Sequence, residues 1–272
     1  MPERIQKILA RWGIASRRKA EQMIIAGRVR CNGQIVTLGD QATPGQDQLA
    51  VDGQLLQAQN RPEDLYILLN KPRGVMSTCH DPHQRRTVLG CLPSRWQRGY
   101  GLHPVGRLDA DSTGAILLTN DGVLTLALTH PRYHLPKTYK VWVAGHPKQA
   151  ALRVWRQGVE LDGVQTRRAV VRVLRSTPEQ TLLEVILREG RNRQIRRIAA
   201  QLGYPVVSLH RSAIGRLGLK SSPDSPSLAL GEYRQIAKPE IEQIFQLSTL
   251  LGKLNLPQAV SENSVCGSRM IS

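Results

Sequence analysis

The sequence has few aromatic residues, no long apolar runs and a shortage of acidic residues. Of its 272 residues, one is Phe, four are Trp and six are Tyr, too few for an RNA binder that stacks bases on a platform of aromatic side chains. No apolar run approaches the roughly 18 residues of a membrane-spanning helix. We therefore expect a soluble protein with no membrane partner.

Four cysteines are spread through the chain, at Cys31, Cys79, Cys91 and Cys266. Their spacing fits neither a CxxC zinc pair nor the disulfide framework of a small secreted domain. The first 12 residues carry charges and lack the apolar stretch of a signal peptide, and Glu3 argues against an organelle transit peptide. We expect free or packed cysteines and a cytoplasmic location.

Lys and Arg outnumber Asp and Glu by 38 to 21, which leaves a formal net charge of +17. Residues 1–30 hold eight Lys or Arg against two Glu, and residues 188–197 hold five Arg against one Glu. Basic side chains bind polyanions because their phosphate contacts release counterions. Two clusters on so basic a chain favour nucleic acid as the partner over a solvated basic face, an anionic membrane or an acidic protein.

Residues 1–60 have the pattern of a small module with two helices and a sheet. Apolar residues at 5, 8, 9 and 12 follow helical spacing, and Ser16 can cap a second helix. The first turn of that helix carries Arg17, Arg18 and Lys19, which add three cations to a helix end that already favours phosphate. Asn32-Gly33 is typical of a tight hairpin turn.

This module resembles the S-four-type RNA-binding domain; the matching residues are Ile5 to Leu9, Ala15 to Ala20 and Ile25 to Gly33. The resemblance implies binding to the backbone of rRNA or tRNA through Arg17, Arg18 and Lys19. Residues 61–65, within a polar stretch that contains Pro62, are expected to link this domain to a second one.

Residues 66–238 predict an α+β domain with a mixed, mainly antiparallel sheet. The predicted strands are 65–69, 115–118, 138–143, 169–175 and 181–187, and the predicted helices are 122–129, 148–156 and 192–202. Asp162-Gly163 marks a hairpin within it. Residues 239–272 are expected to form a C-terminal helix, from Pro239 to about Leu251, and a disordered tail rich in small polar residues over 258–272.

A polar loop bounded by Gly106 and Gly114 precedes the apolar strand 115–118. Three interpretations compete for it. It resembles a capped turn, and it has part of a calcium-loop pattern, but Asn120 stands where a bidentate Glu would be required. In the third interpretation Asp109 is a nucleophile or an acid/base group, with Arg107 on the same extended segment.

The predicted helix 192–202 would separate an apolar face from a basic one. Arg193, Arg196 and Arg197 follow the i, i+3, i+4 spacing of one helix face. Such a face is either solvated or placed against an anion, which would be a phosphate or a carboxylate such as Asp109.

Four blocks closely resemble the pseudouridine synthases of ribosomal RNA, in the branch that contains small-subunit synthase A and large-subunit synthases B, E and F. The blocks are Leu69 to Val75, Val105 to Gly122, Lys137 to Val141 and Glu189 to Arg197. The resemblance implies that a monomer flips one uridine of rRNA, or of a ribosomal assembly intermediate, and isomerises it to pseudouridine. That isomerisation has no net redox change, so neither a cofactor nor a metal is expected.

The resemblance also implies roles for single residues. Asp109 matches the essential aspartate, which attacks either the ribose anomeric carbon or the uracil ring. Tyr139 matches the tyrosine that packs against the base, and Arg196 the arginine that forms a salt bridge with the aspartate. Arg107 is expected to fill the place of the flipped uridine, and Lys71 to support the active-site loop and contact RNA. Arg191 and Arg193 are expected to bind RNA as well.

Other interpretations remain open at this point. The segment from Asp81 to Val88 looks more like that of large-subunit synthase B, which favours large-subunit rRNA over small-subunit rRNA. A non-catalytic rRNA-binding assembly factor and a glycosylase that releases uracil are the rival functions. His130 and His134 have the spacing of a metal pair, but intervening prolines argue against a helix across them.

Overall fold

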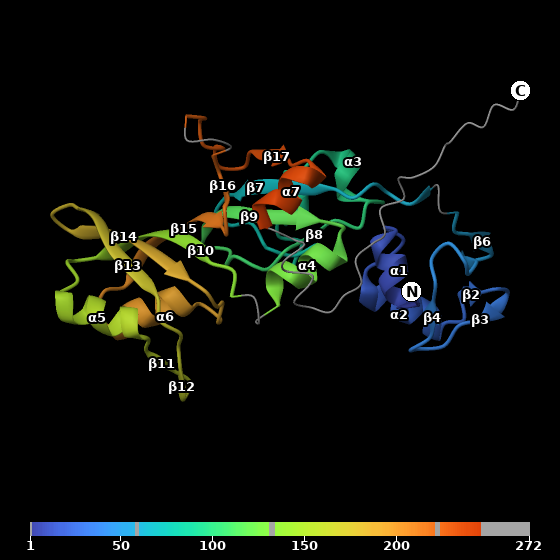
Figure 1. Cartoon of the computed structure of the whole chain (residues 1–272), viewed down its shortest axis with the longest axis horizontal. Helices are drawn as coiled ribbons and strands as arrows, with labels where there is room; N and C mark the ends of the chain where they lie inside the picture. Colours follow the sequence, from blue (N-terminus) through green and yellow to red (C-terminus); the bar gives the residue numbers. More distant parts are fainter. Residues whose placement is uncertain (1, 58–59, 131–133, 221–223, 246–272) are drawn as a thin grey trace, which may run out of the picture.

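The computed structural model describes residues 2–57, 60–130, 134–220 and 224–245. A small N-terminal domain lies at one end of the molecule, and the hairpin of β13 (Val170–Ser176) and β14 (Gln180–Leu187) with helix α5 (Gln149–Gln157) lies at the other (Figure 1). The larger domain is built on a nine-stranded sheet, to which β13 and β14 belong. No helix in these described ranges is long and apolar enough to span a membrane.

The N-terminal domain pairs two helices with a small sheet. Its elements are β1 (Glu3–Arg4), α1 (Ile5–Arg11), α2 (Arg17–Ile25), β2 (Val29–Cys31), β3 (Gln34–Ile35), β4 (Gln41–Ala42), β5 (Leu49–Val51) and β6 (Gln54–Leu55). The Ser16 hydroxyl caps α2 by accepting from the Lys19 amide at 3.3 Å. Asn32 and Gly33 turn the β2–β3 hairpin with φ of 51° and 82°. Both local predictions are confirmed.

The sheet of the larger domain runs in the order β13-β14-β10-β15-β9-β7-β17, with β8 beside β9 and β16 beside β15. The strands are β7 (Tyr66–Lys71), β8 (His103–Pro104), β9 (Thr113–Thr119), β10 (Lys137–Ala144), β13 (Val170–Ser176), β14 (Gln180–Leu187), β15 (Val206–Ile214), β16 (Leu217–Gly218) and β17 (Tyr233–Gln235). Among these pairs only β9 and β15 are parallel, so the prediction of a mixed, mainly antiparallel α+β fold is confirmed.

Helices and a small hairpin cover this sheet. They are the 3-10 turn Leu89–Cys91, α3 (Ser94–Gln97), α4 (Gly122–Thr129), α5 (Gln149–Gln157), α6 (Gln194–Gln201), α7 (Lys238–Phe245) and the hairpin of β11 (Glu160–Leu161) with β12 (Val164–Gln165). The hairpin turns at Asp162-Gly163, as predicted. α5 and α6 pack on β10 and β14, and α4 and α7 pack on β7 and β9.

Both faces of β7 are buried, which explains its continuous apolar run. Tyr66 and Leu68 join the core under α4 and α7, whereas Ile67 and Leu69 point to the opposite face, toward Trp96 of α3. Successive side chains of a strand alternate between faces, so a strand between two helical layers needs apolar residues at every position.

Two expected boundaries differ from the structure. Ile241 and Phe245 of α7 are buried in the same core as β7 and β9, so this helix belongs to the larger domain and does not begin a separate segment after residue 238. α6 begins at Gln194 and not at 192, because Arg193 has a left-handed backbone with φ of 48°. The predicted tail over 258–272 lies outside the described residues.

Candidate active site

The segment that carries Asp109 is held through its backbone along its whole length. The carbonyl oxygens of residues 107 to 111 all accept hydrogen bonds. Their donors, in chain order, are Arg211 Nη1, Ser77 Oγ, the Ser112 amide, the Gly74 amide and Arg196 Nη2, at 3.4, 2.8, 3.1, 2.7 and 3.3 Å. Four of these donors come from three separate parts of the chain outside the loop, so the tertiary fold and not the loop alone sets the position of the Asp109 carboxylate.

The loop is anchored where β9 meets β15. Gly114, the second residue of β9, has φ of 113°, and a Cβ there would lie 2.2 Å from the Arg211 carbonyl oxygen. Only glycine permits this approach. The contact brings Arg211 beneath the loop, where its Nε donates to the Ala115 carbonyl at 2.7 Å.

A cavity of about 660 Å³ opens beside this loop. Its walls come from residues 105–109, the end of α4, β10, residues 187–196 and β15, so it lies over the centre of the sheet. The volume falls in the range of small-ligand sites. Asp109, Tyr139 and Arg196 all line it, which brings together the three predicted catalytic residues; Arg107, Arg191 and Arg193 line it as well.

Two arginines and two aspartates form a charged cluster; Asp109, Arg193 and Arg196 line the cavity, and Asp111 is not among the lining residues. Arg193 Nη1 lies 3.5 Å from Asp109 Oδ2, and its Nη2 lies 3.2 Å from Asp111 Oδ2. Arg196 Nη2 lies 3.3 Å from Asp111 Oδ2. The expected salt bridge of Arg196 with Asp109 is therefore replaced by one with Asp111, and Arg193 is the cation that reaches Asp109.

The left-handed backbone at Arg193 explains the change of partner. It places Arg193 outside α6, so its side chain leaves the predicted helix face and reaches the Asp109 loop. Arg197 turns the other way and pairs with Asp162 of the β11–β12 hairpin at 2.6 Å. The three arginines therefore do not share one helix face as predicted, because Arg193 lies outside α6. Each of them has a carboxylate partner, which matches the expected placement against an anion and not the solvated face.

Asp111 is the best-paired carboxylate of the cluster. Burial alone would raise its pKa, but the hydrogen bond from Arg193 and the charges of Arg196 and Arg193 outweigh burial and lower it. The same bond raises the pKa of Arg193. The cluster thus keeps both signs of charge at neutral pH.

Lys71 is buried at 0% exposure. Its Nζ donates to the carbonyls of Pro72 and Val75 at 2.9 and 2.8 Å and lies 3.5 Å from that of Ala110. The predicted contact with RNA is wrong for this residue, because a fully buried ammonium cannot reach a phosphate. Its predicted support of the active-site loop matches these bonds.

The remaining residues predicted to contact RNA differ in whether their side chains are already bonded within the protein. Arg191 donates to the carbonyls of Val164 and Gln165 at 3.0 and 2.9 Å, so its guanidinium already holds β12 against the cavity wall. Arg107 is exposed at the cavity rim. Arg17, Arg18 and Lys19 are exposed at the start of α2, in the other domain.

Sequence reasoning missed Asp111 and Arg211. Arg211 is only 2% exposed and lines the cavity. Its Nη2 and the Nε of Arg196 are buried atoms with no hydrogen-bond partner in the described part of the chain. An arginine inside an otherwise strand-like run, Val206–Ile214, was the available signal. α4 ends at Thr129, so His130 does not share a helix with His134, as the prolines near them indicated.

Comparisons with known proteins agree with this geometry. The family model of RNA pseudouridylate synthase matches residues 65–201, and that of the S4 domain matches residues 3–47. "Ribosomal large subunit pseudouridine synthase B" of Bacillus subtilis is 37% identical over 249 residues, which are 90% of this chain and 97% of that protein. An uncharacterised RNA pseudouridine synthase of Mycobacterium tuberculosis is 42% identical over 246 residues, covering 89% of this chain and 93% of the relative.

A solved structure described as the crystal structure of a pseudouridylate synthase is similar over 89% of this chain and 99% of its own, with a TM-score of 0.62 and 32% identity. The match includes the sheet that carries the cavity and extends beyond it into the N-terminal region. The chain therefore belongs to the RNA pseudouridine synthase family and is an enzyme of that family with an N-terminal S4 domain.

Proposed function

We propose that this enzyme isomerises a uridine of large-subunit ribosomal RNA to pseudouridine, with Asp109 as the nucleophile and without a cofactor. One observation carries the proposal: the Asp109 carboxylate stands on a loop fixed by five backbone hydrogen bonds, at the wall of a cavity that Tyr139 also lines. The relatives named as large-subunit synthase B, from Bacillus subtilis and Pseudomonas aeruginosa, support the choice of rRNA.

The reaction breaks the bond between the ribose C1′ and N1, turns the base and joins C1′ to C5. The C5 proton leaves and N1 gains a proton, so neither an oxidant nor water is consumed. The Asp109 carboxylate forms a transient bond to the ribose C1′ or to the uracil ring and is released unchanged. Arg193 supports the ionised carboxylate through its 3.5 Å contact.

Tyr139 and Arg107 supply the flat surfaces that a flipped base needs. Tyr139 is 8% exposed on β10, with its ring against the cavity, so it can stack on uracil and lies within the set of groups able to take the C5 proton. Arg107, exposed at the rim, can fill the gap that the uridine leaves in the RNA. These contacts offset the few kcal/mol that unstacking costs.

RNA affinity is assigned to the N-terminal domain and to the rim of the cavity. Arg17, Arg18 and Lys19 are exposed where the α2 dipole also favours phosphate. Arg193 is 45% exposed and so can reach a phosphate while it holds the aspartates. The loop after Asp81, folded by the Asp81–Arg85 salt bridge at 2.7 Å, presents Pro82 to Arg86 to solvent as a further RNA-facing surface.

The test is tritium release from rRNA labelled at uridine C5, with free uracil assayed in the same samples. Wild type should release tritium from large-subunit rRNA without free uracil, and Asp109→Asn should release none while it still binds RNA. Asp162→Asn is the matched control, because Asp162 also pairs with an arginine but lies outside the cavity. It should retain turnover.

Other results would favour the rival functions. No tritium release from either naked RNA or assembly intermediates would indicate a non-catalytic RNA binder. Free uracil would indicate a glycosylase. Turnover by Asp109→Asn would refute the nucleophile assignment, and release from small-subunit rRNA alone would refute the choice of subunit.

A further inference from the structure

We propose that a contact between glycine backbones locks the N-terminal domain onto the synthase domain and makes the enzyme select RNAs that span both. The contact joins Gly13, in the turn between α1 and α2, to Gly99 and Gly101, which precede β8. The inference rests on the proposed action on ribosomal RNA and adds to it a basis for choosing the substrate.

The two backbones touch each other from both sides. A Cβ at Gly13 would lie 2.1 Å from the Gly99 carbonyl oxygen, and a Cβ at Gly101 would lie 2.5 Å from the Ala10 carbonyl oxygen. Real Cβ atoms essentially never come closer than 3.0 Å to such atoms. Any side chain at Gly13 or Gly101 would therefore push the two domains apart, by about 1 Å at Gly13.

Gly13 has a second task, which is to end α1. Its φ of 73° follows the helix C-cap Trp12, the place where a left-handed glycine commonly stops a helix. Gly27, after α2, has the same role with φ of 68°, but a Cβ at Gly27 would meet nothing within 4 Å. The close contact is thus a property of Gly13 in the interdomain setting and does not follow from helix termination.

The contact lies close in sequence to the working residues of both domains. Four residues after Gly13 the chain reaches Arg17 in the exposed basic turn. On the other side, Gly101 leads through buried Leu102 and β8 to Arg107 at the cavity rim. A displacement at the glycines therefore changes the spacing between the basic turn and the Asp109 cavity.

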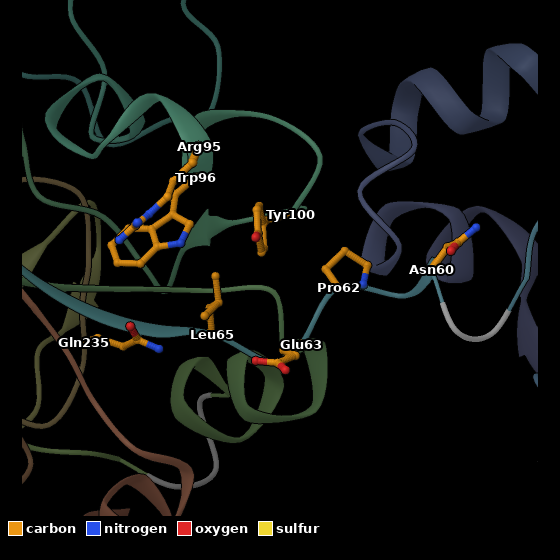
Figure 2. A pocket seen from close by; sticks show the side chains of 8 residues that line it. All are labelled: Asn60, Pro62, Glu63, Leu65, Arg95, Trp96, Tyr100 and Gln235. Atoms are coloured by element: carbon orange, nitrogen blue, oxygen red, sulfur yellow. The ribbon is translucent and has the colours of Figure 1, made fainter.

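The linker between the two domains does not replace this contact. A second cavity, of about 620 Å³, lies beside the linker and is lined by Asn60, by linker residue Pro62 and by Trp96 and Tyr100 of the synthase domain. Figure 2 shows Tyr100 between α3 and the linker, with Pro62 set apart from it across the opening. The linker therefore borders an opening at this place, whereas the glycine backbones of the two domains are in direct contact.

A fixed spacing acts as a geometric filter on the substrate. A large folded RNA gains affinity from both surfaces only when its backbone and its target uridine stand at the matching separation. A short RNA that occupies only the cavity does not use the N-terminal domain. A shift of about 1 Å in a positioned reactant can lower a rate about a hundredfold, so the filter is sensitive to small displacements.

The experiment compares two glycine variants with two matched controls. Gly13→Ala is paired with Gly27→Ala, which has the same left-handed strain without the contact. Gly101→Ala is paired with Gly99→Ala, whose Cβ would also meet nothing within 4 Å. Each is assayed by tritium release on a large folded rRNA fragment and on a short stem-loop that carries the modified uridine.

We expect Gly13→Ala and Gly101→Ala to lose roughly 10- to 100-fold in kcat/KM on the folded fragment and less than about threefold on the stem-loop. The controls should lose less than about threefold on both. Equal losses by variants and controls, or equal losses on both RNAs, would overturn the proposal. Activity on the stem-loop shows that the synthase domain is folded.

Small-angle X-ray scattering measures the arrangement of the two domains and does not depend on enzyme activity. Loss of the contact should release the N-terminal domain to move on its linker, so the two test variants should have a larger radius of gyration than wild type, and the two controls should match wild type. Scattering by Gly13→Ala and Gly101→Ala identical to wild type would overturn the locked arrangement. Absence of turnover by wild type on every RNA would refute the proposed function instead and would leave this scattering result to decide the interdomain contact.

Discussion

Lys71→Met should change how the stability of this enzyme depends on pH. Burial lowers the pKa of Lys71 to about 8, from a usual value of 10.5, although the charges of Cys91, Asp111 and Asp109 oppose the shift. Between pH 8 and 10.5 the unfolded chain therefore holds a proton at this site that the native chain has lost. The free energy of unfolding must then rise with pH in that window.

The size of the effect follows from the two pKa values. Each pKa unit is worth about 1.4 kcal/mol, so the wild-type free energy of unfolding should gain about 2.5 kcal/mol from Lys71 between pH 7 and pH 10. The cost of the buried charge is fully present below pH 8 and is relieved above it. Methionine has no proton to lose, so Lys71→Met should lack this gain.

The assay is urea unfolding of both proteins at pH 7, 8, 9 and 10, with the difference in unfolding free energy plotted against pH. Lys148→Met, which removes an exposed lysine, is the control and should keep the wild-type slope. Parallel curves for wild type and Lys71→Met would refute the reasoning. Turnover by Lys71→Met should also fall, because the carbonyls of Pro72, Val75 and Ala110 lose a donor beside the Asp109 loop.

Two further predictions concern the anchor of the loop and the RNA-binding surface. Gly114→Ala should lower the free energy of unfolding by about 2–5 kcal/mol, since it adds a collision with the Arg211 carbonyl to backbone strain. The control is Gly39→Ala, which has backbone strain without a collision, because Gly39 has φ of 101° and a Cβ there would meet nothing within 4 Å. If urea unfolding shows the same loss of unfolding free energy in both variants, Gly114 does not anchor the loop. Charge reversal of Arg17 and Arg18 to Glu should weaken rRNA binding and flatten the plot of log affinity against log salt by about 0.7–0.9 for each phosphate that the variant no longer neutralises. Reversal of exposed Arg153 and Arg172 to Glu changes the net charge equally; the same change of slope in this control would show that the basic turn of α2 is not a docking surface.

Local structure in the N-terminal domain could be predicted from its sequence because short-range chemistry determines it. A hydroxyl at Ser16 caps α2 through a residue three positions away. Asn32 and Gly33 accept the left-handed backbone of a tight turn. Such features involve neighbours in the chain, so their residue types carry the information.

The partners of the active-site charges could not be predicted in the same way. Helical spacing placed Arg193 with Arg196 and Arg197, but the left-handed backbone at Arg193 ends that periodicity one residue before α6. The Lys71-Pro72-Arg73-Gly74 segment has the pattern of an exposed turn, yet Lys71 is sealed beneath Ala110 from a loop 39 residues away. Side-chain partners at such separations depend on how strands pair.

The class of fold, the order of the domains and the presence of Asp109, Tyr139 and Arg196 in one enzyme follow from the amino-acid sequence alone. They can be predicted from local sequence patterns: the spacing of the apolar residues, the turn residues and the four blocks of similarity. The folded structure was needed to show that Arg193 faces Asp109, that Arg196 faces Asp111 and that Arg211 lies beneath the loop. These contacts arise where β9 pairs with β15 and brings segments distant in the sequence to one cavity. A charged side chain pairs with whichever opposite charge the tertiary fold places within a few ångströms of it.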